Sequence, residues 1–318
     1  MAEPWNEPGS NGLSLGTNEV APAGIFTTSA DYMFSAAGAI PILGGFEYLL
    51  SMTTLKHIDL EQLKKTYEED GYTVVRGLFS PEEVEEIKGA FEEIHRHELS
   101  KAYDDGIRDA SDPLFHYPRI VHPHRFNAVA RRQMLHPGVR SCLGVLFGEE
   151  PVATQTMYYF KPPGARGQAM HQDNLYLLVD PGTCLGAWTA IDRVDRENGC
   201  MMVVPGSHRG NILCQENADT SVSFSGFVTR IPKGMKAVEV PMEPGDTLFF
   251  SGSLIHGSGP NRTKDRFRRS FIGHYAAGSL EKISKFYLPL VKMDGSDYAV
   301  EAQAGGGACG QEWLGAVH

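Results

Sequence analysis

A histidine and an aspartate two residues apart, with a second histidine far downstream, are the residues in this chain best suited to chemistry. The first pair is His171 and Asp173, and the distant residue is His256. If the pair lies on a strand, both side chains point to the same face. Two imidazoles and one carboxylate on one side of a metal ion leave other coordination positions open, which is typical of non-haem Fe(II) oxygenases. We therefore predict an iron site at these three residues.

A further motif downstream strengthens this hypothesis, because a histidine and an aspartate at this spacing also occur as surface turns or buried structural pairs. In the segment 267–270, Arg268 and Ser270 share one face if they lie on a strand. A guanidinium beside a hydroxyl suits the two oxygens of a carboxylate. A dicarboxylate such as 2-oxoglutarate could chelate the metal with one end and pair with Arg268 at the other. Taken alone, the neighbouring arginines would indicate a solvated edge strand.

Short apolar segments in the second half of the chain predict the strands that must position these side chains. Turn residues such as Pro244-Gly245-Asp246 separate the segments. Strands at this spacing are typical of a double-sheet barrel or jelly roll. The apolar segments are 153–160, 185–191, 200–204, 247–250 and 267–275.

Two helices are expected ahead of these strands. Asp59 is followed three residues later by Gln62, and Ser80 is followed in the same way by Glu83. Each pair has the residue types of a capping box, which marks the start of a helix. Between the two helices, the β-branched segment 72–75 predicts a short strand. We expect both helices to support a sheet.

The composition narrows the class of protein. The chain has 318 residues, of which 42% are hydrophobic and 21% charged, and its formal net charge is -10. This indicates a globular protein, and the acidic total counts against a nucleic-acid-binding protein without excluding it, because such a protein normally carries a basic face. The acidic first residues do not resemble a signal peptide, and the apolar stretch 34–50 is too interrupted to span a membrane. We predict a soluble cytoplasmic protein with a small-molecule substrate, and we leave its oligomeric state open.

The five cysteines favour the same location. They include no CxxC pair, and their number is odd. Reduced thiols in a cytosolic protein fit this pattern better than a disulfide framework or a zinc ribbon.

In combination and in order, the motifs resemble the phytanoyl-CoA dioxygenase family of Fe(II)- and 2-oxoglutarate-dependent oxygenases over about residues 65–280. This resemblance implies a mainly β fold with flanking helices, namely a double-stranded β-helix (jelly roll, cupin-like). We expect an arm or lid at 1–55, the oxygenase domain at 56–290 and a tail at 291–318. The matching motifs are Asp70-Gly71-Tyr72, Phe160-Lys161-Pro162-Pro163-Gly164, His171-Gln172-Asp173, Ala187-Trp188-Thr189-Ala190, Glu197-Asn198-Gly199, Pro205-Gly206-Ser207-His208, Pro244-Gly245-Asp246, His256-Gly257-Ser258-Gly259-Pro260-Asn261 and Phe267-Arg268.

The resemblance also implies roles for single residues. His171, Asp173 and His256 would be the iron ligands, and Arg268 with Ser270 would bind the distal carboxylate of 2-oxoglutarate. The positions that contact or surround the same co-substrate would be Gln168, Trp188 and Ser258. The interval between His256 and Arg268 is one residue longer than the spacing commoner in the family. A bulge after Asn261 would absorb the extra residue; otherwise Arg266 or Arg269 would be the carboxylate partner.

The activity that the resemblance implies is oxidation of a C–H bond in a small organic metabolite. Fe(II), 2-oxoglutarate and O2 would take part, with release of succinate and CO2. Related halogenases have Gly or Ala at the carboxylate position, so Asp173 favours hydroxylation. The alternatives are a catalytically silent jelly-roll protein that binds 2-oxoglutarate or a metabolite, and a hydrolytic metal site on the same scaffold. The sequence does not identify the substrate.

A few further residues keep two interpretations. His122 and His124, with Arg119 and Arg125, could bind an anionic substrate or belong to a solvated loop. His274 is expected to be a core strand residue. Core packing is the first interpretation for Tyr158 and Phe160 and a substrate wall the second.

Overall fold

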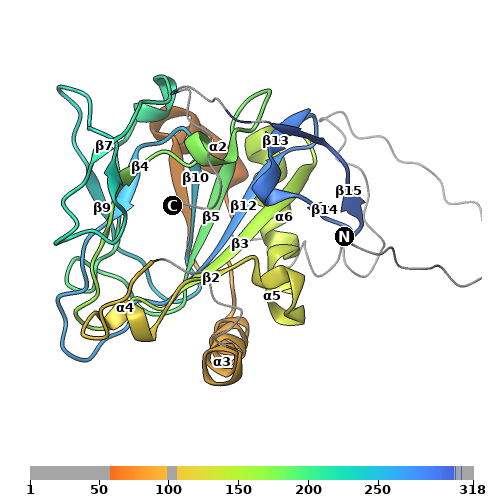
Figure 1. Cartoon of the computed structure of the whole chain (residues 1–318). Helices are drawn as coiled ribbons and strands as arrows, with labels where there is room; N and C mark the ends of the chain where they lie inside the picture. The colour runs from red at the N-terminus through yellow and green to blue at the C-terminus, as the bar shows by residue number, and fades with distance from the viewer. Residues whose placement is uncertain (1–57, 99–105, 304, 306–308, 310–318) are drawn as a thin grey trace, which may run out of the picture. The chain divides into compact units, whose positions relative to one another are not determined.

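Two facing antiparallel sheets form the framework of the protein (Figure 1). The computed structural model describes residues 58–98, 106–303, 305 and 309. In this part of the chain the larger sheet has the order β1-β10-β5-β12-β3-β14-β15, with β2 paired to β3. Its strands are β1 (Tyr72–Val75), β2 (Ile120–Val121), β3 (Pro151–Tyr159), β5 (Leu185–Ala190), β10 (Thr247–Ser251), β12 (Ser270–Ala277), β14 (Leu290–Lys292) and β15 (Asp297–Tyr298).

The smaller sheet lies opposite and has the order β4-β11-β6-β9. Two such sheets make the mainly β, double-stranded β-helix that the sequence predicts. Its strands are β4 (Gln168–His171), β6 (Met201–Val203), β9 (Val238–Val240) and β11 (His256–Ser258). Two short pairs complete the described strands: β7 (Glu216–Asn217) with β8 (Phe227–Val228), and β13 (Lys282–Ser284) with β16 (Glu301–Gln303).

The first two described helices begin where the sequence predicts them. Ser80 and Glu83 form both halves of the capping box. The Asp59 side chain accepts from the backbone N–H of Gln62 at 2.9 Å, but the Gln62 side chain donates to Thr66 instead of returning to the cap. The helices are α2 (Leu60–Asp70), α3 (Pro81–His97), α4 (Pro113–His116), α5 (Ala128–Met134), α6 (Pro137–Phe147) and α7 (Asn174–Leu177), with 3-10 turns η2 (Pro123–Arg125), η3 (Ser207–Arg209) and η4 (Lys285–Tyr287).

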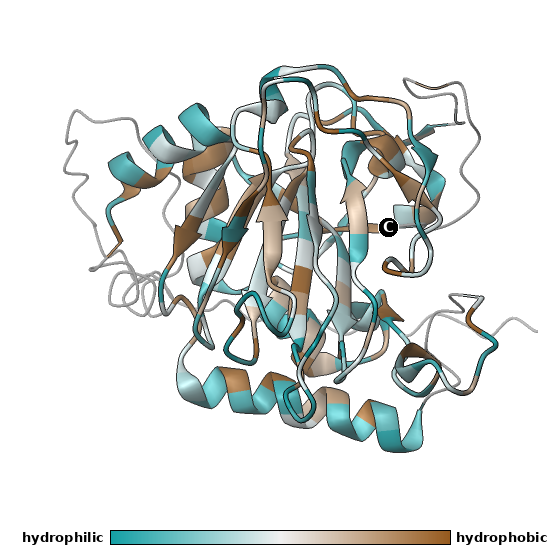
Figure 2. Cartoon of the chain, turned by 90° about the vertical axis from the view of Figure 1, so that its left-hand side faces the viewer, coloured by the Kyte–Doolittle hydropathy of each residue, from teal (hydrophilic) through white to brown (hydrophobic). Residues whose placement is uncertain are grey.

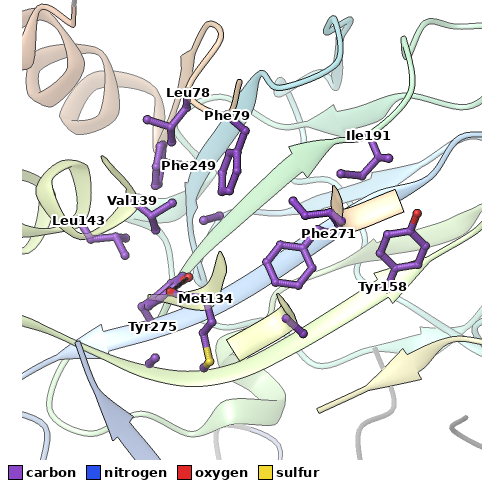
Figure 3. Packing of buried hydrophobic residues seen from close by; sticks show 14 of the residues in the cluster. Leu78, Phe79, Met134, Val139, Leu143, Tyr158, Ile191, Phe249, Phe271 and Tyr275 are labelled. Atoms are coloured by element: carbon purple, nitrogen blue, oxygen red, sulfur yellow. Dashed lines mark hydrogen bonds between the residues drawn. The ribbon is translucent and has the colours of Figure 1, made fainter. Parts of the chain in front are cut away.

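Helices pack on the outer face of the larger sheet. Alternate residues of a strand point to opposite faces, so each strand supplies apolar side chains to this outer face as well as to the inner one. On β12, Phe271 and Tyr275 join the outer core, which α3 also enters. The ring of Phe91 in α3 stacks on Tyr158 of β3 with centroids 3.9 Å apart. Figure 3 shows Tyr158, Phe271 and Tyr275 in this core, and Figure 2 shows that apolar residues interrupt the otherwise hydrophilic α3. Tyr158 and Phe160 both belong to this core, as first interpreted, and Phe160 also lines a cavity beside Arg119 and Tyr159.

A second core fills the space between the two sheets. The larger sheet contributes the inward residues of β3, β5, β10 and β12, and the smaller sheet contributes those of β6 and β9. This inner layer surrounds the candidate active site, and its main apolar members are Met157, Trp188, Met201, Val203, Val240, Leu248, Phe250 and Ile272.

One of the two expectations about the chain ends changes. The predicted tail begins too early, because β14 continues the larger sheet by pairing with β3, and β15 and β16 follow it. The arm expected at residues 1–55 lies outside the described residues. Among the described helices, none has the length and apolar character needed to cross a bilayer.

The expectation that all cysteines are reduced is wrong for one pair. Cys214 and Cys309 form a disulfide, with Cα atoms 5.5 Å apart and 95 residues between them in sequence. The fold brings these residues together from distant segments, so no local spacing motif marks them. Cys142, Cys184 and Cys200 are free and buried.

Candidate active site

Three side chains converge between the sheets at the ends of β4 and β11. His171 is the last residue of β4 and pairs in register with His256, the first residue of β11. Oδ1 of Asp173 lies 3.4 Å from Nε2 of His171 and 3.5 Å from Nε2 of His256. All three side chains are buried, and their ligand atoms lie within 4.8 Å of one another. Such a group of atoms could hold a metal ion.

Asp173 reaches this point by a route that differs from the sequence prediction. We expected His171 and Asp173 to share one face of a strand, but β4 ends at His171 and Asp173 has helical backbone angles (φ -62°, ψ -36°) at the start of α7. Its side chain makes no capping hydrogen bond to that helix. The intervening Gln172 points elsewhere, where it donates to Ser253 O at 2.8 Å. The carboxylate is thus turned to the two histidines rather than to its own helix.

Backbone carbonyls fix the two imidazoles in the orientation that metal binding requires. Nδ1 of His171 donates to Ala169 O at 2.9 Å, and Nδ1 of His256 donates to Leu254 O at 3.0 Å. Each Nε2 is therefore the acceptor nitrogen and faces the common point. Burial lowers the pKa of His256 to about 4, so this ring is neutral near pH 7.

The Asp173 carboxylate is charged despite its burial. Burial by itself would raise its pKa, but the neighbouring histidines hold the pKa of this carboxyl well below its usual range. A carboxylate oxygen and two imidazole nitrogens suit a divalent transition metal.

A pocket of about 380 Å³ surrounds the three side chains and gathers the other predicted residues. Gln168 lies next to His171, with Nε2 of each 3.2 Å apart. Ser270 is fully buried just beyond this pocket and accepts from Arg268 at 3.0 Å. The pocket is lined by His171, Asp173, His256, Gln168, Trp188, Ser258 and Arg268, with apolar walls from Met157, Met201, Phe250 and Ile272.

Arg268 is a buried cation without a carboxylate beside it. Its side chain is 2% exposed, its guanidinium lies 5.2 Å from the Trp188 ring centre, and its Nε has no hydrogen-bond partner. Burial lowers its pKa to about 10, so it remains charged near pH 7. The Lys161 amine nearby donates to Ser258 at 2.8 Å, and burial together with the Arg268 guanidinium holds the pKa of this amine well below its usual range. Buried charges and donors require partners, so this end of the pocket is built for an anion.

The two neighbouring arginines do not face the pocket. Arg266 pairs with Asp195 at 2.7 Å and with Glu197 at 2.9 Å. Arg269 pairs with Asp192 and Glu92, each at 2.7 Å. Both guanidinium groups are thus neutralised by carboxylates outside the pocket, and Arg268 is the arginine of this segment that lines it.

The turn after Asn261 accommodates the longer interval between His256 and Arg268. The Asn261 side chain donates to Lys161 O at 3.1 Å and to Arg266 O at 2.7 Å. Its Oδ1 accepts from the backbone N–H of Thr263 at 3.0 Å. These hydrogen bonds hold the loop 261–266 against the backbone at Lys161. The loop takes up the extra residue, and Arg268 lines the pocket two residues before β12 begins.

Arg119, which the sequence offered as a possible contact for an anionic substrate, lies beside the pocket. Arg119 is 8% exposed, donates to the Tyr159 hydroxyl at 3.3 Å and lies 5.2 Å from the Phe224 ring centre. It lines a neighbouring cavity of about 340 Å³, which Tyr159 and Arg268 share with the first pocket.

His122 and His124 do not belong to a solvated loop, because both are buried. Burial lowers the pKa of His122 to about 2 and that of His124 to about 3. His124 meets the Thr156 hydroxyl at 2.7 Å, and Arg125 donates to the carbonyls of the η4 segment. The two neutral rings therefore do not supply the cationic group that we considered for an anionic substrate.

Comparison with known proteins identifies the family. The family described as Phytanoyl-CoA dioxygenase (PhyH) matches residues 67–270. The peroxisomal phytanoyl-CoA dioxygenase of Rattus norvegicus is 30% identical over 257 residues, which cover 75% of this chain and 73% of that protein. The chain belongs to the phytanoyl-CoA dioxygenase family.

Solved structures similar to this phytanoyl-CoA dioxygenase family member include two enzymes of nogalamycin biosynthesis. The non-haem, α-ketoglutarate-dependent epimerase SnoN has a TM-score of 0.56 and 25% identity, covering 70% of this chain and 83% of SnoN. The carbocyclase SnoK has a TM-score of 0.57 and 22% identity, covering 71% of this chain and 87% of SnoK. The likeness to SnoK shows a shared fold.

Proposed function

We propose that the protein is an Fe(II)- and 2-oxoglutarate-dependent dioxygenase that hydroxylates a small organic metabolite, with release of succinate and CO2. The observation that carries this proposal is the convergence of His171, Asp173 and His256 in one pocket with the buried guanidinium of Arg268. Membership of the phytanoyl-CoA dioxygenase family supports the same reaction class.

The donor set of the site fits the two groups that the reaction needs. His171, Asp173 and His256 would hold Fe(II), since two imidazoles and one carboxylate leave positions free for a chelating keto acid and O2. The unpartnered Nε of Arg268 fits an incoming carboxylate. When bound, the metal and 2-oxoglutarate supply the oxidising chemistry.

The protein's own side chains hold and enclose the co-substrate. Arg268 and Ser270 would bind the distal carboxylate of 2-oxoglutarate. The second co-substrate would be O2. Lys161 fixes the Ser258 hydroxyl in the pocket by the 2.8 Å hydrogen bond. Gln168, Trp188 and Ser258 would line the keto acid, and the apolar inner core excludes water from the reacting atoms.

Hydroxylation is the outcome that Asp173 favours, because a halogenase needs the carboxylate position free for halide. The names of SnoN and SnoK describe an epimerase and a carbocyclase, so this fold supports reactions other than hydroxylation in those proteins. The substrate itself is unidentified, and the cytoplasmic location stays a prediction beside a rat relative that is named peroxisomal.

The experiment that tests the proposed function measures O2-dependent succinate formation with Fe(II), 2-oxoglutarate and a panel of candidate metabolites. We expect succinate from the wild type and near-complete loss in His171→Ala and His256→Ala. His97→Ala is the matched control, because this histidine lies at the exposed end of α3. Ligand variants that form succinate as fast as the wild type would contradict the site. Binding of 2-oxoglutarate without succinate would favour the silent binding protein.

A further inference from the structure

The two oxygens of the Asp173 carboxylate have different neighbours. Oδ1 faces Nε2 of His171 and of His256. Oδ2 lies 2.9 Å from Nε2 of His274, within normal hydrogen-bond distance. Asp173 and His274 are each 2% exposed. One oxygen is thus directed to the metal position and the other to a third histidine.

The backbone of β12 holds His274 firmly in place. This strand is hydrogen-bonded on both sides, to β3 and to β5. His274 pairs with Gln155 and with Gly186 in register, and its carbonyl accepts from Thr154 Oγ1 at 3.0 Å. Its side chain points inward, on the same face as Ser270 and Ile272. A ring on a central strand is a rigid support for a neighbouring carboxylate.

Asp173 needs such a support more than the two histidines do. The imidazoles are oriented by backbone carbonyls two residues away in their own segments. Asp173 precedes a four-residue helix and makes no capping hydrogen bond to it. The contact with His274, 101 residues downstream, therefore supports its carboxylate from outside its own segment.

We propose that His274 is a positioning residue for the metal site. Its Nε2–H donates to Oδ2 of Asp173 and leaves Oδ1 as the oxygen available to a metal. This inference rests on the proposed function. Without the hydrogen bond the carboxylate can rotate and turn Oδ1 away from the point that Nε2 of His171 and Nε2 of His256 face. Loss of such an outer partner typically weakens metal affinity about 10- to 100-fold.

The test measures Mn(II) binding by calorimetry, with Mn(II) in place of Fe(II) so that no oxidation occurs. We expect His274→Leu to bind Mn(II) about 10- to 100-fold more weakly than the wild type. His274→Gln should recover most of the affinity, because its amide can donate at nearly the same reach. His274→Asn keeps a polar amide that is too short, so it should bind as weakly as His274→Leu. A melting curve of each metal-free variant shows whether it is folded.

Tyr275→Phe is the matched control on the same strand. Its hydroxyl donates to Met134 O at 2.8 Å on the outer face of β12, so this variant loses one buried hydrogen bond away from Asp173. It should lower the melting temperature without changing Mn(II) affinity.

The outcomes separate the inference from the proposed function. A wild type that binds no Mn(II) would contradict the metal site itself. A wild type that binds Mn(II), with folded His274→Leu and His274→Asn binding equally well, would overturn the role of His274 and leave the metal site intact. If His274→Leu does not fold, the comparison of His274→Gln with His274→Asn decides. Equal affinities of these two variants would overturn the role as well.

Discussion

Replacing Arg268 by alanine should sharply weaken the binding of 2-oxoglutarate. The guanidinium is 2% exposed and lies beside the buried Lys161, so its carboxylate partner would be shielded from water. Removing one partner of a buried ion pair costs about 3–5 kcal/mol. At about 1.4 kcal/mol per factor of ten, this corresponds to roughly 100- to 3000-fold weaker binding. Arg268→Lys keeps the charge but loses the planar fork, so we expect an intermediate loss of about tenfold.

Calorimetric titration of 2-oxoglutarate into the Mn(II)-loaded protein measures this effect without a known substrate. The matched controls are Arg266→Lys and Arg269→Lys, which change the arginines that pair with surface carboxylates. Both controls should bind 2-oxoglutarate like the wild type. Unchanged affinity in Arg268→Ala, together with a large loss in Arg269→Lys, would refute the assignment of the carboxylate partner.

Three further predictions concern the scaffold. Phe91→Ala removes the ring that stacks on Tyr158 and should lower the free energy of unfolding by about 3–5 kcal/mol in urea titrations; a loss below about 1 kcal/mol would contradict the packing. Burial raises the pKa of Cys142 to about 12, so its thiol stays protonated at pH 8 and should resist alkylation until the protein unfolds. Peptide mapping without reductant should recover Cys214 linked to Cys309, and Cys214→Ser should lower the free energy of unfolding by about 2–4 kcal/mol; two freely alkylated thiols would contradict the disulfide.

The sequence predicted the helix starts and strands that are determined by interactions between residues close together in the chain. The residues around Ser80 specify a helix start through hydrogen bonds within four residues, and the structure shows both of them. The β-branched segment 72–75 forms β1 with the expected bounds. The apolar segments separated by turn residues predicted β3, β5, β6, β10 and β12 to within a few residues.

Long-range pairing decides the features that the sequence did not reveal. The sequence predicted His171 and His256 in one site, but it did not show that they meet because β11 pairs with β4. Asp173 was expected on the strand, but β4 ends before it and α7 turns its carboxylate inward. His274 was interpreted only as a core residue. Its contact with Asp173 was not visible in the sequence, because it joins β12 to a segment far away along the chain. Arg119 likewise gains its place beside the pocket through the pairing of β2 with β3.

The most direct test of the account is an anaerobic titration with Fe(II) followed by 2-oxoglutarate, monitored by visible absorption. A keto acid chelated to Fe(II) gives a charge-transfer band that neither component gives alone. We predict that the band saturates at one Fe(II) per chain in the wild type and is absent in folded His171→Ala. A folded wild-type protein that shows no band at saturating Fe(II) and 2-oxoglutarate would contradict the central claim.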